Sequence, residues 1–460
     1  HYMAFIRKIK KGNAVYLAEV KNYREEGKVK QKVIRYIGKE EDGQVIRRIR
    51  TDDIEIESVK QYLNYKVLHD IALRLNLPDI LGDRYKHILL LIYTQIVNRK
   101  SLYKIPEYIE LTCLKELLNI DKIIDKHLYS ALDELEELDF SEIEDKIFKK
   151  LSLERKEKIA LVLDVTDTYF SGSQADWKSR KGKDGKYGKL IQIALAVTKE
   201  EGFPIMHRTY EGNISNIKIF QDLLTESRLK GFEIIIIDRG MISYENLSDL
   251  RALNQKVITG IRLNKKLKIK YLSTIDREEI FQPENQIKLK NTRVYIIGFD
   301  FEDGRLIAVY NPEIEVAKRM EAMETGDSYK PEEARYMGYS LIYHTTDLSE
   351  EEVVRSYYEK DIVEKAFKEL KSSINLHPIR KYLLTHVKAH IKICYLAYAI
   401  LSYMQYRLKK RNISAIYALE KLQPVYKVDL KSTKEGFNWS KIVTLTKEQK
   451  IILDLLGCSV

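Results

Sequence analysis

Four isoleucines followed at once by an aspartate, in GFEIIIIDRGMIS at residues 231–243, limit the fold of this chain more than any other feature. Consecutive β-branched apolar residues bury both faces of a strand, so the run predicts a strand inside a sheet that is covered on both sides. Asp238 then stands at the rim of that sheet. It is either a turn residue, since Asp and Gly commonly follow strands, or a carboxylate placed to bind a metal ion.

A second apolar strand is predicted at KIALVLDVTDTYF, where it ends at Asp164. A hairpin, LIQIALAVTKEEGFPIMHRTYEGN, and a helix over residues 216–230 separate it from the isoleucine strand. A hairpin pairs its strands antiparallel, and a helical crossover returns the chain to a parallel strand. The order strand, hairpin, helix, strand therefore predicts an α/β sheet with an acid at the end of its first and its last strand.

The rest of the chain divides by residue pattern. Alternating residues near the N-terminus predict three strands with turns at KKGN and EEGK, and the two-residue period places Lys28, Lys30 and Lys32 on one strand face. This face is either solvated or a DNA contact. Helical spacing dominates residues ~57–150. Residues ~265–345 are strand-rich, with a hairpin around EDG at 302–304, and the C-terminal tail has mixed character.

Charge and cysteine content narrow the class of protein. The formal net charge is +11, which favours a polyanionic partner, chiefly nucleic acid. A basic loop, WKSRKGKDGKYGK at 177–189, either follows phosphates or is merely solvated. Cys113, Cys394 and Cys458 lack CxxC spacing, so neither a zinc site nor a disulfide framework is predicted. The apolar stretch at 393–404 is shorter than the roughly 20 residues of a membrane span.

The segment SEEEVVRSYYEKDIVEKAFKELKSSI, residues 349–374, predicts an amphipathic helix that carries a third acid. A Ser-x-x-Glu capping box begins it. On a wheel of about 100° per residue, Tyr357, Lys360, Glu364 and Lys371 form a stripe along the edge of the apolar face. An acid at this edge can reach a pocket without full burial. An ordinary amphipathic helix with boundary charges gives the same pattern when it is taken alone.

With this stripe, the chain resembles the DDE transposases of prokaryotic insertion sequences, in the branch with a Tyr-Arg-Glu-Lys signature (the insertion-sequence-four type and its relatives). Three blocks in order carry the resemblance, which spans roughly residues 55–460: LVLDVTDTYF around Asp164, IIIIDRGMISYENLSDL around Asp238, and YYEKDIVEKAFKELKSSINLHPIR around Glu364. The chain departs from the signature at Lys360, where the family has Arg. The charge is kept, but the bidentate fork of a guanidinium is lost.

The resemblance implies a ribonuclease-H-like α/β core in two parts, residues 156–264 and 346–411, with a β-rich insertion at 265–345 between them. A β-rich leader at 1–50, a helical domain at 51–155 and a tail region at 412–460 complete the expected division. The resemblance further implies that Asp164, Asp238 and Glu364 converge to bind Mg²⁺, for which Mn²⁺ can substitute. With the basic loop and the leader included, the expected DNA contacts are Tyr357, Lys360, Lys371, Arg239, Lys178, Arg180, Lys181, Lys28, Lys30 and Lys32.

These features predict an enzyme that cuts and rejoins DNA phosphodiesters by metal-dependent hydrolysis and transesterification. Its partners would be the terminal inverted repeats of its own element and target DNA, held by a homodimer in a synaptic complex. A cytoplasmic, nucleoid-associated protein without membrane contact is expected. Two alternatives share these residues, a metal-dependent nuclease without strand transfer and a domesticated DNA-binding protein. A carboxylate-pair glycosidase is disfavoured by the net charge of +11.

Some members of the family seal the excised end as a DNA hairpin and stack a flipped base on a Trp of the insertion. The insertion of this chain contains no Trp. Tyr271, Tyr295 and Tyr310 are the aromatic substitutes that the sequence offers. Whether excision proceeds through a hairpin is left open by these residues.

Overall fold

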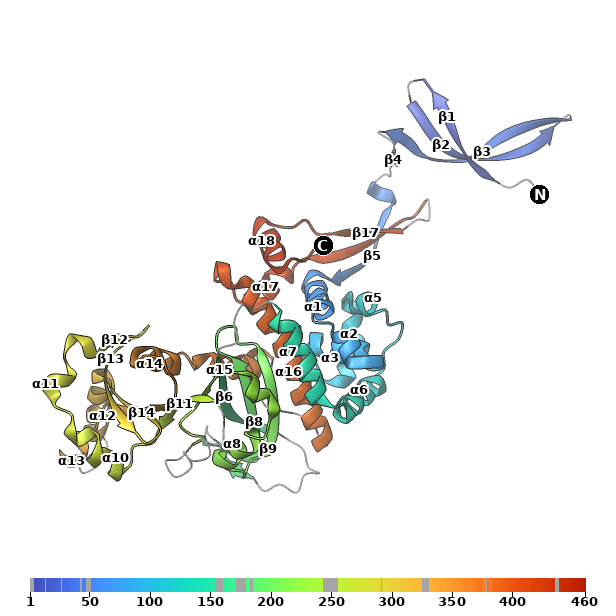
Figure 1. Cartoon of the computed structure of the whole chain (residues 1–460). Coiled ribbons are helices and arrows are strands. Elements are labelled where there is room, and N and C mark those ends of the chain that lie inside the picture. The colour runs from blue at the N-terminus through green and yellow to red at the C-terminus, as the bar shows by residue number, and fades with distance from the viewer. Residues whose placement is uncertain are drawn as a thin grey trace. The chain divides into compact units, whose positions relative to one another are not determined.

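A computed structural model of the chain describes all residues except 1–3, 13, 26, 42–43, 47–50, 154–159, 171–178, 183–184, 243–254, 291, 325–330, 375, 377–378, 380, 382 and 435–437 (Figure 1). The chain forms two compact units. The first contains His1–Lys60 and Val425–Thr444, and the second contains Gln61–Pro424 and Leu445–Val460. Each unit is described by itself.

The first unit holds two antiparallel sheets. The N-terminal sheet has the order β1 (Phe5–Lys11), β2 (Ala14–Glu25), β3 (Lys28–Glu41), β4 (Gln44–Ile46). The turns after β1 and β2 contain Gly12 and Gly27, both in the left-handed region that glycine adopts most easily. The second sheet pairs the C-terminal β16 (Tyr426–Ser432) with β17 (Asn438–Ile442) and with β5 (Ile54–Gln61). The three N-terminal strands are those that the sequence predicts.

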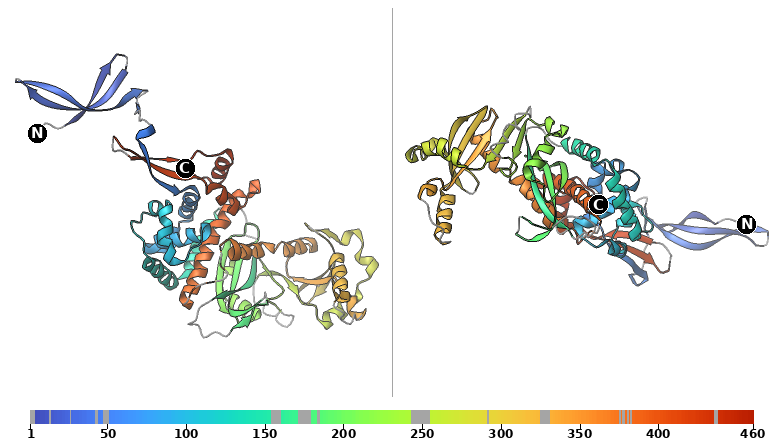
Figure 2. Two further views of the ribbon diagram at one scale, coloured as in Figure 1. Left: turned by 180° about the vertical axis from the view of Figure 1, so that it is seen from behind. Right: turned by 90° about the horizontal axis from the view of Figure 1, so that it is seen from below.

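The helical part of the second unit surrounds one long helix, α16 (Leu384–Leu408), which contacts α1, α3 and α6 on one side and β9 on another (Figure 2). Short helices after α16, α17 (Ala415–Leu422) and α18 (Lys447–Leu456), also pack on it. Among the described residues, no helix combines the length and the apolar character needed to cross a membrane. The N-terminal helices are α1 (Leu63–Arg74), α2 (Leu77–Leu81), α3 (Tyr85–Val97), α4 (Ile105–Tyr108), α5 (Leu114–Leu118), α6 (Asp125–Glu137) and α7 (Phe140–Ser152).

The central sheet begins with β6 (Ala160–Phe170), β8 (Tyr187–Thr198) and β9 (Pro204–Glu211), which pair antiparallel in that order. Helix α8 (Asn216–Leu223) then leads to β10 (Ile234–Ile237), which pairs parallel with β6 on its other edge. Strand β11 (Lys256–Ile261) is parallel to β10. The sequence therefore predicted the order and the directions of the first four strands correctly.

The strand-rich segment at 265–345 continues this sheet instead of forming a separate one. Its last strand, β15 (Tyr339–His344), pairs antiparallel with β11, and the order β15, β14 (Gly304–Tyr310), β13 (Arg293–Phe301), β12 (Gln286–Lys288) follows. Figure 1 shows the surrounding helices gathered at these strands. They are α10 (Lys265–Lys270), α11 (Arg277–Ile280), α12 (Pro312–Glu324) and α13 (Pro331–Ala334).

Three local expectations are wrong. The helix expected over residues 216–230 ends at Leu223, and a separate 3-10 helix, Ser227–Gly231, follows. Strand β6 does not end at Asp164, because residues up to Phe170 keep pairing with β8, so the acid lies inside the strand. Residues 349–374 do not form one helix either. Helix α14 (Glu350–Tyr358) ends before Lys360, α15 (Asp361–Lys368) starts anew, and a π-helical segment, Glu369–Ser373, follows. The capping box at Ser349 is present as predicted.

The two faces of the central strands have different neighbours. Leu161, Leu163 and Ile235, with Ile237, belong to the buried cluster that also contains α8. By alternation, Val162 and Asp164 on β6 point to the opposite face. That face contacts α15. Coverage by helices on both faces explains why these strands are apolar throughout.

A buried ionic cluster connects the helical part to the sheet. The Glu144 carboxylate of α7 is fully buried, with no exposed side-chain surface, and it accepts hydrogen bonds from the His207 backbone N–H at 2.8 Å, from Arg208 Nη1 at 3.0 Å and from Arg228 Nη1 at 2.6 Å. It also contacts His207 Nδ1 at 2.7 Å. Burial alone would raise the pKa of Glu144, but the hydrogen bonds and charges of His207, Arg208 and Arg228 outweigh it and hold the pKa below its usual value.

Replacement of Glu144 by Gln should therefore destabilise the second unit by roughly 3–5 kcal/mol, because it leaves buried cationic partners without their counter-charge. Urea unfolding measures the change, and Glu142→Gln is the matched control, since the Glu142 side chain on the same helix is 63% exposed and pairs with Lys146. The Glu144 contribution should be complete above the ordinary Glu pKa and lost as the pH falls through the lower folded-state pKa. An equal effect of both substitutions would contradict the assignment.

Candidate active site

The two aspartates that follow from the strand pattern lie side by side. Parallel pairing matches Ile236 with Val162 and Ile237 with Leu163, so one further step of the same register brings Asp238 next to Asp164. Both side chains point to the face that α15 covers, because each lies two residues beyond a residue of that face. Adjacent strands are about 4.8 Å apart. The sheet therefore positions two carboxylates within reach of one cation.

The backbone around Asp238 is strongly anchored. Residues 234–237 are all buried, and full burial of one such side chain is worth roughly 1.5–3 kcal/mol. The Gly240 N–H donates to Asp238 Oδ2 at 3.3 Å, and the chain turns there. Burial raises the pKa of the Asp238 carboxyl, but Lys360 and the backbone N–H groups of Gly240 and Arg239 outweigh it, so its pKa lies below the usual value. Asp238 is therefore ionised at neutral pH.

Lys360 lies in the turn between α14 and α15, and its ammonium group forms an ion pair with Asp238 Oδ1. The Lys360 Nζ also lies 4.9 Å from the centre of the Tyr357 ring, a cation–π arrangement. Burial lowers the pKa of Lys360, but Tyr357, Asp238 and Asp164 outweigh it, and the pKa lies above its usual value. The position where the signature has Arg thus holds a charged lysine directly at the second acid.

Glu364 lies on the exposed side of α15, one helical turn after Lys360. In the following π-helical segment, Lys371 Nζ donates to Thr166 Oγ1 of β6 at 2.7 Å. Glu364 therefore lies on the helix between one residue that contacts Asp238 and another that contacts β6. Within the described part of the chain, no group of three or more His, Cys, Asp or Glu side chains is arranged to hold a metal ion. The strand register brings Asp164 and Asp238 together, and Glu364 lies on α15, which packs against β6.

The comparisons with known proteins decide the family. Residues 155–400, more than half of the chain, match the family described as the transposase DDE domain. The chain belongs to the DDE transposases. Residues 6–62 match the N-terminal domain of IS1634 family transposases, so the protein is a transposase of a prokaryotic insertion sequence, as the three blocks predicted. The predicted DNA-cutting and rejoining activity is that of this family.

The other comparisons add little. No curated protein matches the transposase significantly. A solved structure, the cryo-EM structure of the piggyBac transposase synaptic complex with hairpin DNA, is similar over 78% of this chain and 78% of that chain. The identity is 13% and the TM-score is 0.43. A likeness this weak carries no argument about the site.

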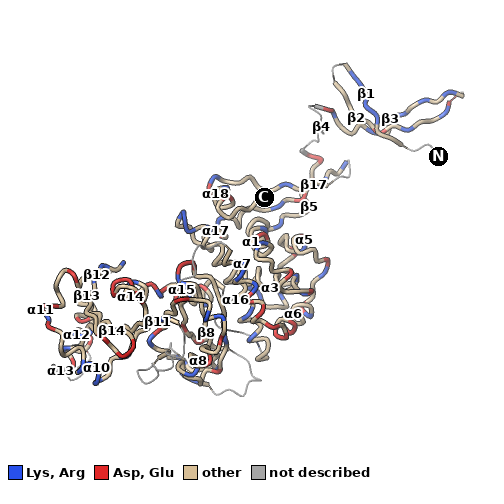
Figure 3. Tube along the Cα trace, viewed as in Figure 1, with Lys and Arg blue, Asp and Glu red and all other residues tan. Residues whose placement is uncertain are grey.

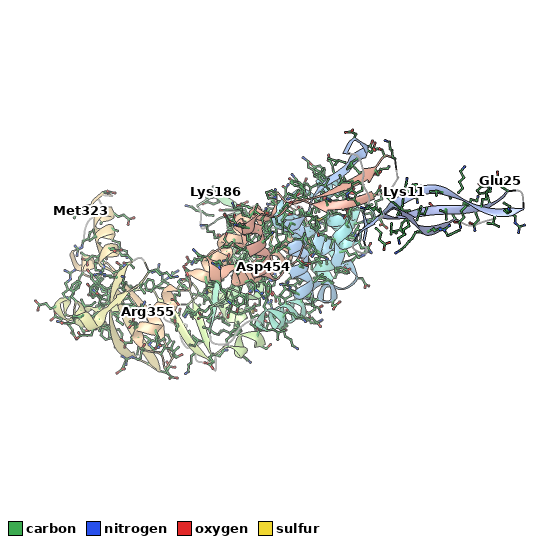
Figure 4. The ribbon with its side chains drawn as sticks, turned by 90° about the horizontal axis from the view of Figure 1, so that it is seen from above. Lys11, Glu25, Lys186, Met323, Arg355 and Asp454 are labelled. Carbon is green, nitrogen blue, oxygen red and sulfur yellow. The ribbon has the colours of Figure 1, made fainter. Side chains whose placement is uncertain are left out.

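The basic loop of the transposase is partly described. Arg180 and Lys181 form β7, which pairs with the start of β8 as Arg180 with Gly188 and Lys181 with Tyr187. This ribbon, β7 with Tyr187 and Gly188, is held by Tyr169, whose hydroxyl donates to the Lys186 carbonyl at 2.8 Å. Figure 4 labels Lys186 at the edge of the molecule. Lys178, another predicted contact, lies outside the described residues.

Strand register separates the two described cations of the ribbon. Leu195 pairs with Asp164, and alternate residues of β8 back to Tyr187 share its side. Lys181, opposite Tyr187, is therefore on the side of Asp164, whereas Arg180 is on the other side. The sequence analysis placed Arg180 and Lys181 together, because residue pattern alone does not give the strand pairing that decides on which side of the sheet each residue lies.

The N-terminal sheet of the transposase has one basic face. Lys28, Lys30 and Lys32 share it as predicted, and the pairing of β1, β2 and β3 adds other exposed cations to the same face, namely Lys8, Lys10, Lys21 and Arg35. Figure 3 shows Lys and Arg along these strands, and Figure 4 labels Lys11 and Glu25 at the ends of β1 and β2. The opposite face buries Ala18 and Val20. The face of Lys28, Lys30 and Lys32 also carries Glu19, Glu25 and Glu40, which pair with Arg35, Lys30 and Lys8, so part of its positive charge is neutralised.

The three tyrosines proposed as base-stacking substitutes differ in exposure. Tyr271 and Tyr310 are 7% and 5% exposed and belong to the core of the insertion, so neither offers a free ring face. Tyr295 is half-buried and lines a cleft of about 420 Å³ together with Lys288, Lys290 and Arg293. Lys270 Nζ lies 5.0 Å from the centre of the Tyr271 ring, so of the three it is the greater exposure of Tyr295 that sets it apart.

The sequence analysis did not single out Gly260, the residue against which Tyr357 packs. Gly260 lies inside β11, and a Cβ atom there would be 2.9 Å from Tyr357 Cζ and 2.8 Å from Arg239 Cβ. Both distances are below any real Cβ contact. A glycine inside a strand pattern signals close approach of another group, and this signal was available at GIR, residues 260–262. Gly260 thus brings two predicted DNA contacts together beside Asp238.

Substitution of Gly260 by Ala should displace Tyr357 and Arg239 and reduce DNA cleavage by the transposase by about 10- to 100-fold, the usual effect of disturbing residues that support a catalytic group. Cleavage is measured as strand products on a denaturing gel. Gly231→Ala is the control, since nothing lies within 4 Å of a Cβ at Gly231. Unchanged cleavage by Gly260→Ala would show that the function of Tyr357 does not depend on its close approach to residue 260.

Proposed function

We propose that the transposase cuts the ends of its insertion sequence with a divalent metal site formed by Asp164, Asp238 and Glu364. The observation that carries this proposal is the register of β10 with β6, which sets two carboxylates side by side on the face covered by α15. Glu364 supplies the third carboxylate from α15 when the site closes on DNA.

The strand order supports a ribonuclease-H-like core. The five strands run β9, β8, β6, β10, β11 across the sheet, with β8 antiparallel to the others and β10 reached through α8. The two parts of this core, residues 156–264 and 346–411, enclose the insertion at 265–345 in sequence. The leader at 1–50, the helical domain at 51–155 and the tail at 412–460 complete the proposed division.

The donor set fits Mg²⁺, with Mn²⁺ as a substitute. Carboxylate oxygens are the hard ligands that Mg²⁺ prefers, and it keeps several waters, so few protein ligands suffice. Asp238 already attracts a cationic group, the Lys360 ammonium. A divalent ion held by these carboxylates would supply activation of the attacking oxygen and stabilisation of the leaving oxygen of a phosphodiester. Asp164 and Asp238 would hold it on the rigid sheet, and Lys371 beside Thr166 would bind a neighbouring phosphate.

DNA would contact both units. The face of the N-terminal sheet that carries Lys28, Lys30 and Lys32 would bind the DNA backbone of the terminal repeat. Lysines along a strand contact phosphates without making base-specific contacts. Arg239 and Tyr357 would meet the DNA near the cleaved bond. Since two ends must be joined in one reaction, we propose a homodimer in a synaptic complex. The protein would work in the cytoplasm on nucleoid DNA.

Asp164→Asn, Asp238→Asn and Glu364→Gln should each lower metal-dependent cleavage of the element's ends by more than about 100-fold, because even outer-shell partners of a metal ligand are worth about 10- to 100-fold. Strand products on a denaturing gel with Mg²⁺ or Mn²⁺ give the readout. Asp361→Asn is the control, since Asp361 is paired with Lys365 on the same helix.

Cuts at the element boundary that need all three acids would support the proposal. Cuts scattered regardless of end sequence would instead favour a nuclease without strand transfer. Tight, salt-sensitive binding without any cutting would favour a domesticated DNA-binding protein.

Lys181→Ala should weaken binding to end DNA and lower the salt dependence of binding by about one counterion, whereas Arg180→Ala should change neither. Both substitutions remove one positive charge from neighbouring positions of β7. They differ in side, since Lys181 lies opposite Tyr187 and Arg180 opposite Gly188. Fluorescence anisotropy over a salt series measures both effects, and equal effects would contradict a DNA path on the side of Asp164.

A further inference from the structure

Lys360 occupies an unusual position for a DNA-contacting residue. Its ammonium group is paired with Asp238, and the Lys360 side chain is only 18% exposed, whereas Asp238 is 35% exposed. The lysine therefore points inward at a carboxylate of the proposed metal site.

The surroundings hold the lysine in this position. The Tyr357 ring faces Lys360 Nζ at 4.9 Å, and the tight turn between α14 and α15 is closed by the Lys360 N–H donating to the Tyr357 carbonyl at 3.3 Å. Tyr357 itself is seated on Gly260. The ion pair is thus part of a packed arrangement that starts at β11 and ends at Asp238.

An ammonium group and a divalent ion compete for the same carboxylate. Two like charges within a few ångströms of each other repel strongly in a partly buried site. Lys is well suited to such an exchange, because it is a compact point charge on a flexible stem, whereas a guanidinium holds a carboxylate through a rigid fork. A DNA phosphate beside the site offers the displaced ammonium a new partner.

We propose that Lys360 is a positioning residue whose ammonium group pairs with Asp238 until a DNA phosphate binds that ammonium group instead. Divalent-metal binding at Asp238 is thereby coupled to DNA binding. This inference rests on the proposed metal site of Asp164, Asp238 and Glu364. Without DNA the lysine neutralises Asp238 and disfavours the metal. With DNA the lysine pairs with phosphate, and Asp238 becomes available as a ligand.

The first test measures Mn²⁺ binding to the full chain without DNA, from the loss of the electron paramagnetic resonance signal of free Mn²⁺. Lys360→Met should bind Mn²⁺ on the order of 10-fold more tightly than the unaltered protein, within the usual range of coupling between sites. Lys365→Met is the matched control, because it removes the same charge from α15 at a residue paired with Asp361. Lys360→Arg should retain weak binding, and thermal unfolding checks that each variant is folded.

The second test uses reciprocity. If bound DNA raises the affinity of the protein for Mn²⁺, then bound Mn²⁺ must raise its affinity for DNA by the same factor. Fluorescence anisotropy with an already cut element end, at constant ionic strength, should show this gain in the unaltered protein and a smaller gain in Lys360→Met. The cut end carries a 3′-dideoxy terminus, so it has neither a bond left to cut nor a 3′-hydroxyl to join to other DNA, and the comparison excludes chemistry.

A third variant separates the two proposals. Adding Asp164→Asn to Lys360→Met should abolish the tight Mn²⁺ binding if the acids hold the ion. Equal Mn²⁺ affinity of Lys360→Met and the unaltered protein, with binding still dependent on Asp164, would overturn the role of Lys360 and leave the metal site standing. Mn²⁺ binding that ignores Asp164 in every variant would overturn both.

Discussion

The parallel pairing of β10 with β6 is the contact on which the site depends. It aligns Ile236 with Val162 and Ile237 with Leu163, and so sets Asp238 beside Asp164. The buried isoleucines make any slip of this register costly, since a shift by one residue would turn Asp238 toward the apolar cluster with α8. The same residues that stabilise the sheet therefore determine the spacing of the two carboxylates.

The helix that carries the third acid is less regular than the sheet, and its breaks have consequences. The turn before α15 lets Lys360 fold back onto Asp238, and the π-helical segment after it brings Lys371 to Thr166. Between these two attachment points Glu364 remains exposed.

Other parts of the second unit support this arrangement from outside. The Glu144 cluster joins α7 to β9, while β15 extends the sheet from β11 into the insertion. Gly260 of β11 seats Tyr357 next to Asp238. Strand β11 therefore connects the insertion, through β15, with the strands that carry Asp164 and Asp238, and it also contacts Tyr357.

The sequence by itself determined the local features of this transposase: the apolar strands that bear Asp164 and Asp238, their order and direction, the capping box before Glu364, and the shared face of Lys28, Lys30 and Lys32. These follow from periodicity and from turn residues, which act between near neighbours. Only the tertiary structure decided that β6 continues past Asp164, that the helix breaks at Lys360, that Arg180 and Lys181 lie on opposite sides, and that Lys360 is paired with Asp238. Each of these depends on a partner far away in the chain, and residue pattern alone carries no information about which distant groups meet.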